Sequence, residues 1–251
     1  MNADDTMKFS ASTFPVVEDS NTGGEALRRI RSFVRREGRM THAQRRAFAE
    51  CWARFGVDTG AAMLEPEWLF GRRAPLVLEI GFGDGESLVA MAMAHPEMDY
   101  LGIEVHRPGI GHVLLRAEAL ELSNLRVMCA DVVEVLRQLP DESLARIQIF
   151  FPDPWPKTRH HKRRLIQSSF IMPLVSKLKW AGQLHVATDC EDYAHSILNV
   201  LRAVPELTNA ADGDGFAARP AYRPLTRFER RGRRLGHEVW DMLFVRSQPG
   251  L

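Results

Sequence analysis

The sequence contains little cysteine and no long apolar run. Its three cysteines, Cys51, Cys129 and Cys190, are far apart and form no C-x-x-C pair. This spacing argues against a zinc site and a disulfide framework and indicates reduced thiols in a cytoplasm. No run of apolar residues reaches the ~18 needed for a membrane span. Residues 1–5 lack the basic and apolar regions of a secretory signal, so we expect a cytoplasmic protein.

Charge is nearly balanced overall but is unevenly distributed along the chain. The 251 residues carry a net charge of +1, whereas residues 25–54, 157–164 and 219–234 carry +6, +5 and +6. If these segments converge in space, they form a surface for a polyanion. The alternative is three solvated charged faces. Because the rest of the chain is acidic, we favour a nucleic acid partner.

Strand-like and helix-like segments alternate from residue 75 onward. This alternation predicts an α/β fold with a mostly parallel, doubly wound sheet and helices on both faces. Ligands bind such sheets at the carboxyl ends of the strands. Strands are expected at 76–80, 99–104, 125–129, 144–151, 182–188 and 237–246, and helices at 86–95, 108–122, 131–138, 163–179 and 190–203.

The N-terminal part of the chain has a different pattern. Residues 1–24 mix polar residues, proline and glycine without periodicity, so we expect a disordered arm. Residues 25–37 and 41–55 have apolar residues at helical spacing, and 58–74 is expected to be an irregular connector. We therefore divide the chain into an arm (1–24), a basic helical extension (25–74) and a main domain (75–251).

A glycine-rich turn follows the first expected strand. Residues 79–85 read Glu-Ile-Gly-Phe-Gly-Asp-Gly, a G-x-G-x-G spacing that differs from the G-x-G-x-x-G of dinucleotide-binding turns. A carboxylate at Glu79 is a poor neighbour for a pyrophosphate but a good one for a cationic ligand. S-adenosylmethionine carries a sulfonium and an ammonium and no phosphate, so we prefer it to a nicotinamide dinucleotide. The alternative is a tight turn with no ligand.

Acidic residues end the next two strands. Glu104 closes the second strand, and Asp131 follows the third. Glu104 is placed to accept hydrogen bonds from ribose hydroxyls, and Asp131 from an adenine amino group. Each could equally cap the helix that follows. Together with the glycine turn, they predict a nucleoside cofactor.

Residues 150–164 combine a rigid loop with a basic run. Three prolines surround Asp153 and Trp155 and restrict the backbone on both sides of them. Five Lys/Arg and two His follow within residues 157–164. A carboxylate, an aromatic ring and phosphate-binding charge suit a protein that holds one nucleobase while contacting the RNA backbone. The alternative is a proline-rich structural turn.

The motif Phe-Phe-Pro-Asp-Pro-Trp-Pro-Lys-x-Arg-His-x-Lys-Arg-Arg at 150–164 resembles the signature of the bacterial tRNA (guanine-N7-)-methyltransferases, the TrmB family. Segments 78–83, 102–106, 187–189, 226–232 and 234–241 are also similar to that family, and the similarity runs from about residue 30 to 246. The resemblance implies a Rossmann-like, class I S-adenosylmethionine-dependent methyltransferase domain at 75–251. It also implies methyl transfer to N7 of a guanine in the tRNA variable loop, with S-adenosylhomocysteine as the other product.

The resemblance further implies roles for individual residues. Asp153 would be catalytic. The cofactor would contact Glu79, Gly81, Gly83, Glu104, Asp131 and Asp153. The substrate guanosine would contact Lys157, Asp189, Thr226, Arg227, Phe228 and Glu229. The RNA would contact Arg159, His160, His161, Lys162, Arg163 and Arg164.

The chemistry of guanine N7 limits what the protein must supply. N7 has an in-plane lone pair and no proton, so no general base is needed, and we expect in-line positioning to dominate catalysis. We expect Asp153 to accept a hydrogen bond from the N1–H or amino edge of guanine and to favour the cationic product ring. Trp155 would stack on the base or pack under the loop, and Asp189 could instead cap the helix at 190. No metal is expected.

Three rival functions stay open from the sequence. One is a methyltransferase that acts on a protein or a small molecule, and another is a non-catalytic RNA-binding module. The third is a nicotinamide oxidoreductase, which the glycine spacing and Glu79 disfavour.

Overall fold

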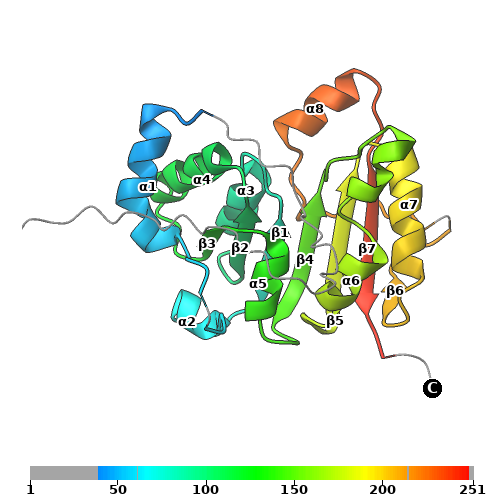
Figure 1. Cartoon of the computed structure of the whole chain (residues 1–251), viewed down its shortest axis with the longest axis horizontal. Coiled ribbons are helices and arrows are strands. Elements are labelled where there is room, and N and C mark those ends of the chain that lie inside the picture. The colour runs from blue at the N-terminus through cyan, green and yellow to red at the C-terminus, as the bar shows by residue number, and fades with distance from the viewer. Residues whose placement is uncertain (1–38, 61, 214, 249–251) are drawn as a thin grey trace, which may run out of the picture. The chain divides into compact units, whose positions relative to one another are not determined.

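Seven strands form a single sheet in the order β3-β2-β1-β4-β5-β7-β6 (Figure 1). The computed structural model describes residues 39–60, 62–213 and 215–248, so the arm expected at 1–24 and the helix expected at 25–37 lie outside the described residues. Strands β1 to β5 pair in parallel, whereas β7 is antiparallel to both β5 and β6. The predicted mostly parallel sheet is confirmed. The strands are β1 Leu76–Ile80, β2 Asp99–Glu104, β3 Leu125–Cys129, β4 Leu144–Phe150, β5 Leu178–Thr188, β6 Leu207–Asn209 and β7 Trp240–Arg246.

Helices cover both faces of this sheet and bury two separate apolar clusters. On one face, α5, α6 and α7 pack on alternate residues of the strands, such as Leu78 and Ile147. On the other face, α1, α3 and α4 pack on the intervening residues, such as Val77 and Tyr100 (Figure 1). All five residues of β1 are buried, as expected for a central strand covered on both sides. The helices are α1 His42–Phe55, α2 Pro66–Phe70, α3 Glu86–Ala94, α4 Arg107–Ala119, α5 Val132–Gln138, α6 Ser168–Val175, α7 Glu191–Arg202 and α8 Arg227–Arg234, with a 3-10 helix, η1, at Thr158–Arg163.

Helix α1 packs on helix α4 and reaches the sheet at its edge strand β3. A capping box begins the helix, because the Thr41 hydroxyl accepts a hydrogen bond from the Gln44 amide while the Gln44 side chain accepts one from the Thr41 amide. Gln44 also donates to the Pro108 carbonyl at the start of α4, at 3.0 Å. Cys51 and Phe55 are buried in the same cluster as α3 and α4. The described part of the basic extension therefore shares the core of the main domain.

The helix expected at 163–179 is wrong at both ends. The basic run forms the η1 turn, α6 begins only at Ser168, and the chain is already in β5 at Leu178. Pro173 lies inside α6. A bulge causes the early start of β5, since Leu144 pairs with Leu178 while Arg146 pairs with Gln183.

Three short elements were not expected from the sequence. The connector at 58–74 contains the one-turn helix α2, and β6 has only three residues. Helix α8 reads RFERRGRR and has no apolar face for periodicity to detect. Its signal was instead the pair Thr226-x-x-Glu229, which has the spacing of a capping box. No helix in the described ranges is both long and apolar enough to cross a bilayer.

Candidate active site

The glycine-rich turn leaves β1 with its backbone in a left-handed conformation. Gly81 and Gly83 have φ values of 72° and 60°, and a Cβ added at either position would meet nothing within 4 Å. Side chains other than glycine rarely adopt this conformation, so the turn requires these residues. It leaves open space beside the backbone where a ligand can approach closely.

Glu104, at the end of β2, holds this turn in place. Its Oε2 accepts a hydrogen bond from the Gly83 amide at 2.9 Å, and its Oε1 accepts from the amides of Val105 and His106 at 2.7 and 3.0 Å. The structure thus joins two residues that were predicted separately. Each carboxylate oxygen has two lone pairs, so Oε1 is fully used by its two amide donors, whereas Oε2 keeps acceptor capacity for a hydroxyl group.

Helix α4 packs against the same turn. A Cβ built on Gly109 would lie 1.9 Å from the Gly83 carbonyl oxygen, so only glycine fits this approach. Two residues later, a Cβ on Gly111 would meet the Gln44 side chain of α1 at 2.8 Å. Gly109 therefore supports the turn, and Gly111 supports the packing of α1.

Glu79 is buried beneath the turn and is only partly satisfied. It is 1% exposed, and its Oε1 accepts a hydrogen bond from the Ser87 hydroxyl at 2.7 Å. Its Oε2 is buried and has no hydrogen-bond partner. Burial raises the pKa of Glu79 to about 7. An unpartnered buried carboxylate oxygen is costly unless a ligand donates to it, and a cationic group fits that need.

Asp131 caps the helix that follows β3. Its carboxylate accepts a hydrogen bond from the Val133 amide at 3.0 Å, so the capping alternative is confirmed. A cap uses only part of the acceptor capacity of a carboxylate, so this does not exclude a second partner. Glu79 and Glu104 thus lie at the carboxyl ends of the adjacent strands β1 and β2, and Asp131 follows β3 at the same edge of the sheet.

The proline-rich loop that follows β4 is strained at two positions. Phe151 and Trp155 have φ values of 53° and 45°, which are unfavourable for bulky side chains. The Phe151 amide donates to the Ala187 carbonyl at 2.7 Å, which ties the loop to β5. Asp153 lies between these two positions, is exposed, and makes no hydrogen bond or ion pair with the described residues. A free carboxylate is thus held at the edge where β1 and β4 adjoin.

Arg164 is buried, whereas the sequence predicted that it would face RNA. It is 5% exposed, its Nε donates to the Pro154 carbonyl at 2.9 Å, and its Nη2 pairs with Asp192 of α7 at 2.5 Å. Its guanidinium also lies over the Tyr193 ring. The predicted RNA contact of Arg164 is therefore corrected, because its donors are used to fix the Asp153 loop to α7.

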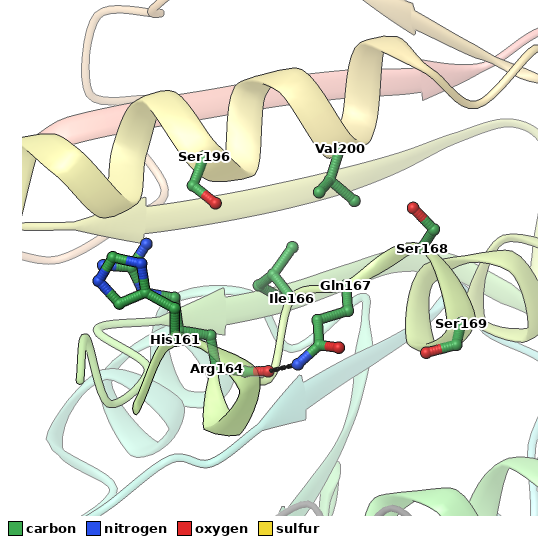
Figure 2. Close-up of a pocket in the computed structure, with 8 residues that line it drawn as sticks. All are labelled: His161, Arg164, Ile166, Gln167, Ser168, Ser169, Ser196 and Val200. Atoms are coloured by element: carbon green, nitrogen blue, oxygen red, sulfur yellow. Dashed lines mark hydrogen bonds between the residues drawn. The ribbon is translucent and has the colours of Figure 1, made fainter. Parts of the chain in front are cut away.

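A hollow of about 380 Å³ lies behind the basic turn, between η1, α6 and α7 (Figure 2). Figure 2 shows His161 and Arg164 at one end, Ser196 and Val200 of α7 along one side, and the start of α6 opposite. None of the predicted cofactor residues lines it. This hollow is therefore separate from the strand-end acids.

The rest of the basic turn is more open. Lys157, Arg159, Lys162 and Arg163 are exposed, and His160 and His161 are half-buried. Trp155 is flanked on two sides, because the Arg163 guanidinium lies 5.1 Å from its ring centroid and the His160 ring meets it edge-on at 6.0 Å. Trp155 therefore packs against side chains of the loop and of η1, as one of the two alternatives for this residue predicted.

Asp189 follows β5 at the same edge of the sheet. The N-cap of α7 is Cys190, with no side-chain capping bond, so the structure does not support the capping alternative for Asp189. Asp189 is half-buried and makes no hydrogen bond with the described residues.

Helix α8 lies over the strand ends (Figure 1) and is tied to the glycine turn. Thr226 caps it by accepting a hydrogen bond from the Glu229 amide. The Arg227 amide donates to Glu86 Oε2 at 2.8 Å, and the Arg230 side chain reaches Glu86 Oε1 at 3.3 Å. Since Glu86 is the first residue of α3, the predicted substrate segment lies beside the predicted cofactor turn.

Glu229, which the resemblance places against the guanosine, is buried and already has protein partners. It is 1% exposed, and both of its oxygens accept hydrogen bonds from Arg223, at 2.6 and 3.2 Å. Arg233 donates to the same carboxylate at 2.9 Å. Two guanidinium groups thus donate hydrogen bonds to the Glu229 carboxylate.

A buried polar network that the sequence analysis missed continues from this pair. Arg223 also donates to both oxygens of Asp241 in β7, at 2.7 and 2.9 Å. His185 Nε2 lies 2.8 Å from Asp241, and Tyr222 is 2.9 Å from His185 Nδ1. Burial lowers the pKa of His185 and raises that of Tyr222 to about 12, so a neutral His185 donates to Asp241 and accepts from Tyr222. The available signal was a polar residue inside an apolar strand, as at Gln148 in β4 and His185 in β5.

Comparisons with known proteins identify the family of this chain. Residues 73–242 match the family described as "Putative methyltransferase". The chain is 53% identical over 234 residues, 93% of its length, to 98% of a protein of Edwardsiella ictaluri named tRNA (guanine-N(7)-)-methyltransferase. It is 54% identical over 222 residues, 88% of its length, to 96% of a protein of the same name from Nitrosospira multiformis.

A solved structure supports the fold. The crystal structure of the 16S rRNA methyltransferase KamB aligns with a TM-score of 0.54 at 16% identity, over 73% of this chain and 93% of that one. At this identity the likeness shows the fold alone, which is the Rossmann-like class I methyltransferase fold. By sequence over nearly its whole length, the chain belongs to the tRNA (guanine-N(7)-)-methyltransferase family.

Proposed function

We propose that this chain transfers the methyl group of S-adenosylmethionine to N7 of a guanine in the variable loop of tRNA, in the cytoplasm. The observation that carries the proposal is the shared edge of the sheet. The strand-end acids, the Asp153 loop and the start of α8 all lie at the carboxyl ends of the strands. A donor and a base held at this edge would adjoin each other.

The residues present fit the donor. The buried, unpartnered Oε2 of Glu79 suits a cationic group, and the open side of Gly81 and Gly83 lets a ligand approach the backbone. Glu104 and Asp131 would accept from the ribose and the adenine amino group. When bound, S-adenosylmethionine supplies an electrophilic methyl group carried on a sulfonium. The proposed cofactor residues are therefore Glu79, Gly81, Gly83, Glu104, Asp131 and Asp153.

The protein's own part in the reaction is to orient the base and to stabilise charge. Guanine N7 has no proton to lose, so no side chain needs to act as a base. Asp153 accepts from the N1–H or amino edge of guanine, where its fixed negative charge favours the cationic product ring. The restricted backbone on both sides of Asp153 fixes the position of that residue in the loop, so its carboxylate stays within reach of the base.

The substrate side is proposed to lie on three segments. Lys157, Asp189 and the Thr226 to Phe228 segment would contact the guanosine, with Glu229 supporting them from behind. The exposed side chains of η1 would contact RNA phosphates. Residues 75–251 would form the catalytic domain, and the arginines of α1 would extend the RNA surface.

The test is direct. The purified protein is incubated with isotope-labelled S-adenosylmethionine and an unmodified tRNA transcript, and the modified nucleoside is mapped. The expected product is N7-methylguanosine in the variable loop, and a transcript with adenosine at that position stays unlabelled. Label on another atom, or equal label on both transcripts, would refute the proposal.

A further inference from the structure

Arg223 is a buried cation at the junction of the two predicted walls of the substrate site. It is 1% exposed and makes four hydrogen bonds, two to Glu229 of α8 and two to Asp241 of β7. Its guanidinium also lies 5.8 Å from the ring centroids of Phe150 and Phe151, where β4 enters the Asp153 loop. One side chain therefore touches the sheet, the start of the catalytic loop and α8.

We propose that Arg223 is a positioning residue that fixes the 226–234 segment at the substrate site through Glu229. This inference rests on the proposed function, because it takes residues 226–228 to contact the guanosine. It gives a role to Arg223, to which the resemblance assigned none. It also makes Glu229 a residue that holds α8 in place and does not itself contact the guanosine.

Three features of α8 explain why it needs such an anchor. The helix has eight residues, five of them arginines, and no described side chain other than Glu229 is buried. Among these described side chains, apolar burial therefore contributes little to the docking of the helix. Its polar links are the buried pair to Arg223 and the exposed contacts of Arg227 and Arg230 with Glu86. Exposed pairs contribute little, so the buried pair dominates the position of the helix.

The charge balance around Arg223 is also specific. Glu229 and Asp241 raise the pKa of Arg223 against the effect of burial. Asp241 in turn keeps a lowered pKa, even though burial alone would raise it, because His185 and Arg223 donate to it. Removing the guanidinium leaves two buried carboxylates without their shared cation, and α8 is the element that can move to expose one of them.

A matched control lies on β7, the strand that carries the Arg223 partner Asp241. Arg246, at the far end of β7, is also buried and bonds the Leu178 carbonyl and Glu206. It lies at the opposite edge of the sheet from the site. Arg246→Met therefore reports the general cost of losing a buried arginine from β7.

The experiment compares wild type, Arg223→Met, Arg223→Lys and Arg246→Met. It measures thermal stability, the Kd for S-adenosylmethionine, kcat and KM for tRNA, and amide hydrogen exchange of 226–234. We expect Arg223→Met to raise the KM for tRNA by about tenfold or more and to speed exchange in α8, with the Kd for the donor within about twofold. Arg223→Lys keeps the charge but cannot make the paired hydrogen bonds of the guanidinium. Its KM for tRNA and its exchange in α8 should therefore lie between those of wild type and Arg223→Met. Arg246→Met should lose stability while its KM for tRNA stays within about twofold.

A double variant tests whether the effect passes through Glu229. If it does, Arg223→Met with Glu229→Gln raises the KM for tRNA no more than the larger of the two single changes. Additive effects, or unchanged KM and exchange in Arg223→Met, would overturn the proposal. If Arg223→Met does not fold, a wild-type KM and wild-type exchange in Arg223→Lys overturn it equally. The hydrogen-exchange result does not need tRNA, so it separates a failure of this inference from a failure of the proposed function.

Discussion

At the scale of single residues, the site combines carboxylates that accept hydrogen bonds from the protein with carboxylates that lack such partners among the described residues. Glu104 and Glu229 have their carboxylates engaged by protein donors. Asp153 and Asp189 make no hydrogen bond with the described residues, and Glu79 keeps one buried oxygen without a partner. A buried polar atom without a partner is costly, so the Glu79 oxygen marks a position where a ligand is expected to bind, and the accessible Asp153 and Asp189 carboxylates are available to one.

Asp153→Asn should separate catalysis from stability. The carboxylate is exposed and has no bonded partner among the described residues, so its loss should leave thermal stability unchanged. Loss of one aligned charge next to the reacting base should lower kcat by about 100-fold or more. Steady-state kinetics and a tRNA-binding assay check this, and near-normal turnover with unchanged RNA affinity would show that Asp153 does not have this role.

Glu79 should make donor binding depend on pH. Because burial raises its pKa to about 7, the carboxyl is protonated below that value and loses its attraction for a cation. The affinity for S-adenosylmethionine should therefore fall as the pH drops through about 7 and then level off at the affinity of the neutral form. Calorimetry across the range checks this, and Glu79→Gln should bind more weakly with a flat profile. An equally steep profile in Glu79→Gln would assign the titration to another group.

The same shift has a consequence for stability, with the opposite sign to that of a salt-bridged acid. The pKa of Glu79 is raised from 4.5 to about 7, so between these values the folded protein holds a proton that the unfolded chain has released. The contribution of Glu79 to folding stability is present below pH 4.5, falls as pH rises to about 7 and is lost above it. Glu79→Gln should therefore melt at a higher temperature than wild type above pH 7, a stability gain at the expense of donor binding.

At the scale of elements, the turn after β1 depends on its neighbours as much as on its own glycines. Gly109→Ala would push a methyl group into the Gly83 carbonyl, so it should weaken S-adenosylmethionine binding by about tenfold or more. Gly111→Ala, in the same helix, should lower the melting temperature by disturbing Gln44 of α1 but leave donor affinity near wild type. Calorimetry and thermal melts on both variants check this. Equal donor affinity in the two variants would show that α4 does not support the turn.

Elements with a strong apolar pattern could be predicted from the sequence, and those held by polar contacts could not. Strand β1 and helix α3 have the expected bounds to within a residue, since burial alone dictates them. Helix α8 depends on the Thr226 cap and on Arg223, which periodicity does not detect. The start of β5 depends on a bulge beside β4, which is a property of strand pairing. In the candidate site, the strand-end acids followed from topology, whereas the burial of Arg164 and Glu229 required the three-dimensional contacts.

At the scale of the whole molecule, charge should control the encounter with tRNA. Each phosphate contact contributes about 0.7–0.9 to the slope of log affinity against log salt. Arg159→Ala with Lys162→Ala, two exposed changes in η1, should therefore reduce the slope by about 1.4–1.8. Arg73→Ala with Lys179→Ala removes the same charge at the amino ends of β1 and β5, the opposite edge of the sheet. A filter-binding series in salt checks this, and equal slope changes in the two double variants would show that η1 has no special contact with RNA.

The most direct test of the central claim is a crystal structure of the protein with S-adenosylhomocysteine and guanosine. The account predicts the product's sulfur at the carboxyl ends of β1 and β4, with its amino group near Glu79 and its ribose on Glu104. Guanine N7 should face that sulfur, with Asp153 on the guanine edge and residues 226–228 against the nucleoside. A ligand in another part of the molecule, or Asp153 directed away from the base, would contradict the account.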